Sequence, residues 1–266
     1  VSTREHISRL KAARLQSQLM NTNLVIVART DSESATLLDN NIDPVDHPFI
    51  IGAFINPSGN SERYSGDTNN NDSTIEHCTL REAVCIRLKE LGREHEYNHD
   101  DFNCSFDEAW YKIKELGLNI NWDMETTRTH EGYYRIKGGV DYSIQRAKAY
   151  ADYADLLWME TSKPLLDTAK RFSDEVIKAY PSAKLAYNLS PSFNWSGMNM
   201  TDEELQNFTI ELGRLGFVWQ FITLAGFHLN GLACEKFAKD FKERGMLAYV
   251  EDIQREEQDL KLEILK

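Results

Sequence analysis

Short apolar runs that alternate with amphipathic helical segments constrain the fold of this chain more than any other feature of its sequence. One such run, residues 24–28, contains no polar residue. A strand of that composition is covered on both faces, as the strands of a parallel sheet are. Similar runs lie at residues 156–159, 185–187 and 217–224. The pattern therefore predicts an α/β fold with parallel strands.

Helical patterns precede and separate these apolar runs. They cover residues 4–20, 140–153, 164–180, 201–215, 230–244 and 246–265. In the first of them, the apolar residues Leu10 and Leu19 are expected to lie on one buried face. Thr201 and Glu204 have the spacing of a capping box, and Gly245 is typical of a residue that ends a helix.

A long interval between the first and second predicted strands indicates an insertion. We divide the chain into an α/β segment at 1–40, an inserted segment at 41–121, a second α/β segment at 122–245 and a C-terminal helix at 246–266. The inserted segment holds a polar run at 69–72 and helical patterns at 79–91 and 105–116, so it is predicted to be helical. A surface elaboration without chemistry is its simplest interpretation.

The predicted strands are too few for a complete parallel fold. A closed (β/α)₈ barrel has eight strands, and a doubly wound sheet usually has five or six. No strand precedes the first helical pattern, and the sequence starts at Val1 rather than at a methionine. The sequence is therefore expected to be a fragment that lacks the N-terminal part of its fold.

The composition excludes several classes of protein. With 41% hydrophobic and 27% charged residues, the chain has the balance of a globular protein and not of a disordered one. A net charge of −12 does not fit the basic surface that binds nucleic acid. No run approaches the roughly 20 apolar residues that span a bilayer. The spacing of the four cysteines predicts reduced thiols.

Polar side chains follow each of the predicted strands, where parallel α/β folds place their active groups. The candidate site residues are Arg29, Glu160, Asn188, Ser190, Ser192 and Thr223. A guanidinium, a carboxylate, an amide and hydroxyls in this arrangement predict a pocket for a small, oxygen-rich anion. Arg29 is suited to a carboxylate because its planar fork donates two parallel hydrogen bonds.

Each candidate also has a purely structural interpretation. Arg29 forms an ion pair with Asp31 or Glu160 in that alternative, and Asn188 and the two serines are turn residues. Thr223 is then a hydroxyl satisfied within the core. No histidine or cysteine pattern predicts a metal site, because the pair with helical spacing in the inserted segment lacks a supporting carboxylate pattern.

Five blocks of this sequence resemble the isocitrate lyases, in the same order along the chain. They are Val25–Asp31, Arg128–Tyr134, Trp158–Thr161, Ala186–Trp195 and Gln220–His228. Within the fourth block, Ser-Pro-Ser-Phe-Asn-Trp is the most specific motif. The resemblance covers about 1–40 and 122–255, and the long insertion and Leu189 resemble the eukaryotic, fungal-type branch. Residues 221–227 fit isocitrate lyase better than its methylisocitrate-cleaving relative.

The resemblance implies a fold and an activity. The fold is the (β/α)₈ barrel of the isocitrate lyase and phosphoenolpyruvate mutase kind, with 1–40 and 122–245 as barrel segments and only the C-terminal half of the barrel present. The activity is Mg²⁺-dependent cleavage of isocitrate to succinate and glyoxylate in the glyoxylate cycle, by homotetramers that exchange C-terminal helices. By position, Arg29, Asn188, Ser190, Ser192 and Thr223 are implied to bind substrate carboxylates, and Glu160 is implied to face the glyoxylate and the metal.

One departure from the family pattern is serious. The catalytic cysteine of the family lies in a Lys-Lys-Cys-Gly-His segment, which these 266 residues do not contain. The resemblance places that segment and the metal ligands upstream of Val1, so no catalytic residue or metal ligand is assigned in this chain. The chain alone is therefore expected to be inactive.

Two other functions stay open at this point. One is methylisocitrate cleavage, and the other is a non-catalytic remnant that binds dicarboxylates. The resemblance allows a glyoxysomal or peroxisomal location or a cytoplasmic one, and residues 264–266 do not spell the peroxisomal signal Ser-Lys-Leu.

Overall fold

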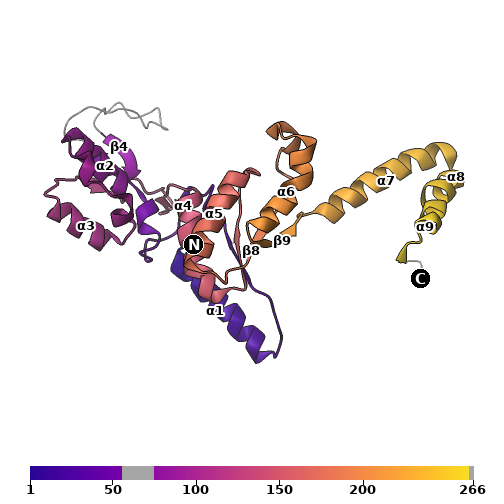
Figure 1. Ribbon diagram of the computed structural model, residues 1–266, viewed down its shortest axis with the longest axis horizontal. Helices are drawn as coiled ribbons and strands as arrows, with labels where there is room; N and C mark the ends of the chain where they lie inside the picture. The colour runs from indigo at the N-terminus through magenta and orange to yellow at the C-terminus, as the bar shows by residue number, and fades with distance from the viewer. Residues whose placement is uncertain (56–74, 264–266) are drawn as a thin grey trace. The chain divides into compact units, whose positions relative to one another are not determined.

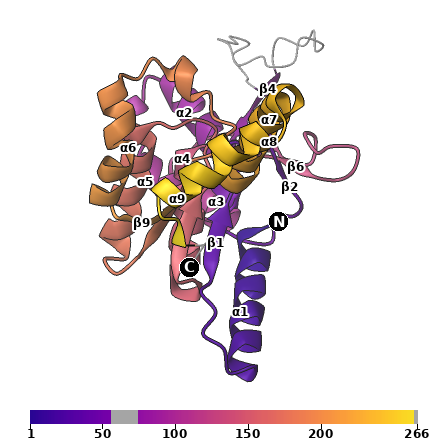
Figure 2. The ribbon, with the colours of Figure 1, turned by 90° about the vertical axis from the view of Figure 1, so that its right-hand side faces the viewer.

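The computed structural model describes residues 1–55 and 75–263 (Figures 1 and 2). The chain divides into two compact units. The first contains Val1–Tyr187 and Trp195–Gln220, and the second contains Asn188–Asn194 and Phe221–Lys266.

A four-stranded sheet confirms the predicted apolar runs. Its strands, in spatial order, are β1 (Val27–Thr30), β7 (Leu156–Met159), β8 (Leu185–Asn188) and β9 (Phe217–Phe221). The pairs β1–β7 and β7–β8 are parallel, as the composition of the runs indicates. The predicted bounds are wrong at two places. β1 begins at Val27, because Leu24 and Val25 are exposed, and β9 ends before Thr223.

Helices flank this sheet in the first unit. They are α1 (Thr3–Leu19), α4 (Val140–Tyr150), α5 (Leu166–Ala179) and α6 (Asp202–Arg214), with 3-10 turns at Ala151–Tyr153 and Trp195–Met198. The capping box of Thr201 and Glu204 begins α6 as predicted. The predicted face of α1 is wrong, since Leu10 is buried but Leu19 is 73% exposed.

The inserted segment is not purely helical, which corrects the sequence-based prediction. Its helices α2 (Leu80–Glu90) and α3 (Phe106–Glu115) lie close to the predicted ranges. It also holds most of a three-stranded antiparallel sheet, in the order β4 (Ile75–Thr79), β3 (Ile51–Ile55) and β5 (Trp122–Asp123). A two-stranded ladder joins β2 (Leu37–Leu38) to β6 (Tyr134–Arg135), and 3-10 turns lie at His47–Phe49, Glu94–Glu96 and His99–Phe102. The polar run 69–72 lies outside the described residues.

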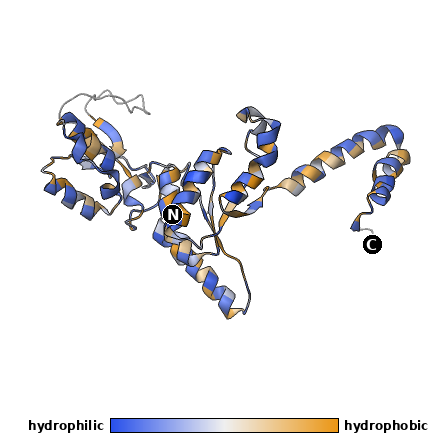
Figure 3. Ribbon diagram, viewed as in Figure 1, coloured by the Kyte–Doolittle hydropathy of each residue, from blue (hydrophilic) through white to orange (hydrophobic). Residues whose placement is uncertain are grey.

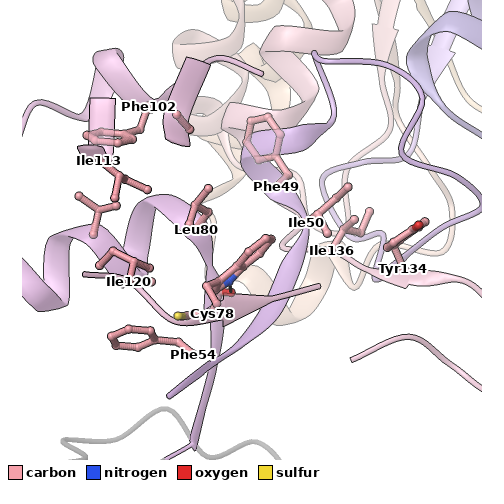
Figure 4. Close-up of a cluster of buried hydrophobic side chains, with 14 of the residues drawn as sticks. Phe49, Ile50, Phe54, Cys78, Leu80, Phe102, Ile113, Ile120, Tyr134 and Ile136 are labelled. Carbon is pink, nitrogen blue, oxygen red and sulfur yellow. Dashed lines mark hydrogen bonds between the residues drawn. The ribbon is translucent and has the colours of Figure 1, made fainter. Parts of the chain in front are cut away.

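This segment has its own hydrophobic core, which Figure 4 shows. Phe54, Leu80 and Ile113 pack there, and Trp122 donates a hydrogen bond of 2.8 Å to the carbonyl of Cys78. The Trp122 ring lies so close to Gly52 that a Cβ there would stand 2.4 Å from its Cε2 atom. The absence of a side chain at residue 52 is therefore what lets the indole cover β3.

The second unit is mostly helical. Its α7 (Ala225–Arg244) starts earlier than residue 230, and Gly245, with φ +56°, ends it as predicted. The chain continues as α8 (Met246–Tyr249), a π-helix (Val250–Arg255) and α9 (Glu256–Asp259). Arg244 forms ion pairs with two carboxylates of the π-helix, Glu251 and Asp252. Hydrophobic and hydrophilic residues alternate along α7, and none of its residues is buried (Figure 3). Among the described helices, none is long and apolar enough to cross a membrane.

Candidate active site

Arg29 is held at the end of β1 by acidic and aromatic neighbours. Its Nε donates to Asp31 Oδ1 at 2.8 Å, and its Nη2 lies 3.9 Å from Glu160 Oε2. The guanidinium carbon stands 4.5 Å from the ring centroid of Trp158, which precedes Glu160 at the end of β7. Parallel pairing of β1 and β7 places Arg29 opposite Trp158, so the sheet register itself produces this stack. The predicted ion pair is therefore present, with the side chain of Arg29 still 47% exposed.

A cavity of about 320 Å³ opens beside Arg29. Thr30, Asp31 and Ser32 line it together with Tyr142 and Arg146 of α4. Thr30 and Ser32 are buried, and their hydroxyls are 2.9 Å apart. The wall of this cavity therefore combines guanidinium, hydroxyl and carboxylate groups with the apolar side chains of Leu37, Leu38 and Ile136, the mixture typical of small-molecule sites.

A buried acidic group bonds to two of the residues that line this cavity, Tyr142 and Arg146. Asp46, which is fully buried, accepts hydrogen bonds from the Thr3 backbone at 2.7 Å and from the Tyr142 hydroxyl at 2.6 Å. Arg146 Nη1 lies 3.1 Å from the same carboxylate. Burial and the charge of Asp46 raise the pKa of Tyr142 and keep it a neutral donor. The sequence analysis missed Asp46, Tyr142 and Arg146, because partners 96 and 100 residues apart leave no local pattern.

The other predicted residues belong to the second unit and form two hydrogen-bonded pairs. Thr223 Oγ1 donates to Asn188 Oδ1 at 3.1 Å, which fixes the orientation of the amide. The hydroxyls of Ser190 and Ser192 lie 2.6 Å apart, and Ser190 also accepts from the Ser192 backbone at 3.2 Å. Asn188 and Ser190 are buried. These pairs match the structural alternative, a satisfied turn, as well as a binding role.

Leu224, directly after Thr223, adopts a left-handed backbone conformation with φ +60°. Such a conformation is rare for a residue with a branched side chain and is more common at binding sites. It lies in the turn between β9 and α7, where the Ala225 N–H donates to the Ile222 carbonyl at 3.3 Å. Its side chain is 66% exposed.

The carboxylates of the described residues do not form a divalent metal site. Among residues 1–55 and 75–263, no group of three or more histidine, cysteine or acidic side chains is arranged to hold an ion. The two acidic groups next to Arg29, Asp31 and Glu160, both lie against its positive charge. Among the free cysteines, Cys78 is buried in the inserted segment, and burial raises the pKa of its thiol.

Comparison with known proteins gives one consistent family. A model of the isocitrate lyase family matches residues 1–65 and 85–266. Over its full length, the chain is 39% identical to isocitrate lyase of Oryza sativa subsp. japonica and 40% identical to isocitrate lyase of Saccharomyces cerevisiae. A mitochondrial 2-methylisocitrate lyase of Hypocrea atroviridis is 35% identical over the full chain.

The alignments cover 51%, 52% and 51% of these three relatives, so the chain spans about half the length of the curated relatives it matches. The residues that the family model matches include the ends of β1, β7, β8 and β9. The chain belongs to the isocitrate lyase family.

Proposed function

We propose that this chain is the substrate-carboxylate-binding part of an isocitrate lyase, which cleaves isocitrate to succinate and glyoxylate. The observation that carries the proposal is the set of polar residues at the ends of β1, β7, β8 and β9, in a chain that isocitrate lyases match over its whole length. We propose further that the four-stranded sheet is part of a (β/α)₈ barrel, as the family membership implies.

Arg29 is proposed to exchange a carboxylate partner when substrate binds. Its pair with Asp31 is exposed to solvent, and exposed pairs contribute at most about 1 kcal/mol. A substrate carboxylate that accepts two charge-assisted hydrogen bonds from the guanidinium replaces such a pair at little cost. Stacking on Trp158 keeps the plane of the guanidinium fixed during the exchange.

Asn188, Ser190, Ser192 and Thr223 are proposed to bind carboxylate oxygens through neutral donors. Hydroxyl and amide donors carry no charge, so they orient a carboxylate without neutralising it. As the carbon–carbon bond breaks, negative charge develops on the departing succinate, and prearranged donors stabilise it without reorganisation. Glu160 is proposed to lie on the glyoxylate side.

The family generally uses a divalent metal, and we propose Mg²⁺ for the whole enzyme. Since the described acidic residues do not form an ion site, no step is assigned to the metal here. We also propose a homotetramer, which is consistent with the unburied apolar side chains of α7.

The test uses protein expressed from the complete coding sequence that contains these residues. Glyoxylate is measured after addition of isocitrate, and pyruvate after addition of 2-methylisocitrate, each with and without chelator. Glyoxylate formation with at least tenfold preference for isocitrate supports the proposal. Preference for 2-methylisocitrate identifies the chain as part of a methylisocitrate lyase. Succinate binding without any cleavage identifies a non-catalytic remnant that binds dicarboxylates.

A further inference from the structure

The loop that follows β1, residues 31–35, is held against the start of α4. It begins with Asp31, the carboxylate partner of Arg29. The backbone N–H groups of Ser34 and Ala35 both donate to the Asp31 carbonyl, at 3.2 and 3.1 Å, so the loop is a tight turn. The position of the Asp31 carboxylate beside Arg29 therefore depends on how firmly this turn is held.

A chain of three buried hydroxyls ties the start of the loop to α4. Thr30 Oγ1 and Ser32 Oγ lie 2.9 Å apart, and Ser32 Oγ lies 3.0 Å from Ser143 Oγ. Ser143 in turn donates to the Gly139 carbonyl at 3.3 Å, and the Gly139 N–H donates to the Ser32 carbonyl at 3.0 Å. All three hydroxyl-bearing residues are buried. Because a buried hydroxyl that loses its partner is costly, these bonds fix the backbone of the loop.

Gly138 lets the loop lie directly against the backbone that leads into α4. A Cβ at this glycine would stand 2.6 Å from the Ala35 carbonyl oxygen and 2.9 Å from the Ser32 carbonyl oxygen. Both oxygens belong to the backbone, so neither can move aside as a flexible side chain would. The loop and the start of α4 are thus in close contact as well as hydrogen-bonded.

Glu33 joins the same loop to the end of β7. Its carboxylate accepts hydrogen bonds from the backbone N–H of Ser162 at 3.2 Å and from the Ser162 hydroxyl at 3.3 Å. Ser162 comes shortly after Glu160 in the chain, and Glu33 comes shortly after Arg29. The strand ends that carry these two candidate site residues are therefore linked through the loop as well as through the pairing of β1 with β7.

Ser143 differs from the other two members of the hydroxyl chain in its position. Thr30 and Ser32 line the cavity beside Arg29, whereas Ser143 does not line it and is fully buried. Any effect of Ser143 on a ligand in that cavity is therefore indirect and passes through Ser32 and the turn.

We propose that Ser143 is a positioning residue for the carboxylate site at Arg29. By fixing Ser32, it holds the turn that carries Asp31, and Asp31 together with Trp158 sets the orientation of the guanidinium. Without the Ser143 hydroxyl the turn gains freedom, and the guanidinium must be ordered when a ligand binds, which costs affinity. The inference rests on the proposed binding role of Arg29.

The test uses the protein expressed from the complete coding sequence. Isocitrate kinetics and the dissociation constant of succinate, by calorimetry, are measured for Ser143→Ala, for Arg29→Lys and for the double variant. Ser32→Ala breaks the same chain at its middle and takes the place of Ser143→Ala if circular dichroism shows that variant to be unfolded. Ser173→Ala is the matched control, because Ser173 is a buried serine of α5 whose hydroxyl donates to the Leu215 carbonyl.

We expect Ser143→Ala to lower kcat/KM for isocitrate and to weaken succinate binding about threefold to tenfold, the effect of one hydrogen bond. In the Arg29→Lys background the same substitution changes either value by less than about twofold, because the group through which it acts is already altered. Ser173→Ala lowers the melting temperature and leaves kcat/KM unchanged. An equal effect of Ser143→Ala in both backgrounds, or none in the folded variant, overturns the proposal. If the wild type binds succinate but does not cleave isocitrate, the lyase function fails, while the succinate measurements still decide the role of Ser143.

Discussion

Arg29 has both a structural and a functional interpretation, and a charge-conserving substitution separates them. Arg29→Lys in the complete protein keeps the positive charge but loses the bidentate geometry. We expect the rate of isocitrate cleavage to fall about tenfold or more, since a charge-assisted hydrogen bond contributes about 1.5–3 kcal/mol. Arg14→Lys is the matched control, because Arg14 also pairs with a carboxylate, Asp155 at 2.6 Å, before the start of β7. Wild-type kinetics in a folded Arg29→Lys variant would make the ion pair structural.

The two serines of the second unit are tested in the same way. Ser190→Ala and Ser192→Ala should weaken succinate binding and leave the melting temperature almost unchanged. Ser105→Ala is the opposite control. Its hydroxyl caps α3 with Glu108, so its loss should lower stability by about 1 kcal/mol without any effect on affinity. A lower melting temperature with intact affinity in the Ser190 or Ser192 variant would show that these serines only stabilise the turn.

At the scale of single residues, the sequence predicts what depends on near neighbours. The capping box at Thr201 is confirmed, since its partner Glu204 lies three residues away. The stack of Arg29 on Trp158 and the salt bridge of Arg146 with Asp46 depend on tertiary pairing, which no spacing in the sequence encodes.

At the scale of secondary-structure elements, Asp46 joins α1 to α4. It accepts hydrogen bonds from Thr3 at the start of α1, and it pairs with Arg146 of α4. Asp46→Ala leaves the buried guanidinium unpaired, so we expect a loss of about 3–5 kcal/mol in the free energy of unfolding. Denaturant unfolding measures it. Glu5→Ala removes the exposed ion pair of Glu5 with Arg9 within α1, so it should lower the free energy of unfolding by less than about 1 kcal/mol. Equal losses in the two variants would contradict the role of Asp46.

Elements with strong periodicity were predicted well, and short strands were not. The helix α5 buries Ala169, Phe172 and Val176 at the spacing its sequence indicates. The sequence does not predict the three-stranded antiparallel sheet, because β5 has only two residues and β4 mixes apolar residues with Glu76 and His77. On α1, the apolar periodicity predicts a buried face, but Leu10 alone among its apolar residues is buried.

At the scale of the whole molecule, the apolar side chains of the second unit predict association. Phe227, Leu229 and Leu232 are 72%, 67% and 57% exposed on α7. Exposed apolar residues gathered on one helix favour contact with another protein surface. We expect residues 1–266 to elute above the monomer mass in size-exclusion chromatography with light scattering. Phe227→Asp combined with Leu232→Asp should shift the population toward monomer. A monomeric wild-type chain at high concentration would contradict this expectation.

The central claim is that this chain supplies substrate-binding residues to an isocitrate lyase whose reaction needs further groups. The most direct test measures glyoxylate released from isocitrate, with added Mg²⁺ and a reductant, by the protein expressed from the complete coding sequence and by residues 1–266 alone. We expect the complete protein to release glyoxylate and residues 1–266 to release none above a control without enzyme, because the Lys-Lys-Cys-Gly-His segment of the family is absent from them. Turnover by residues 1–266 alone, or none by the complete protein, would contradict the account.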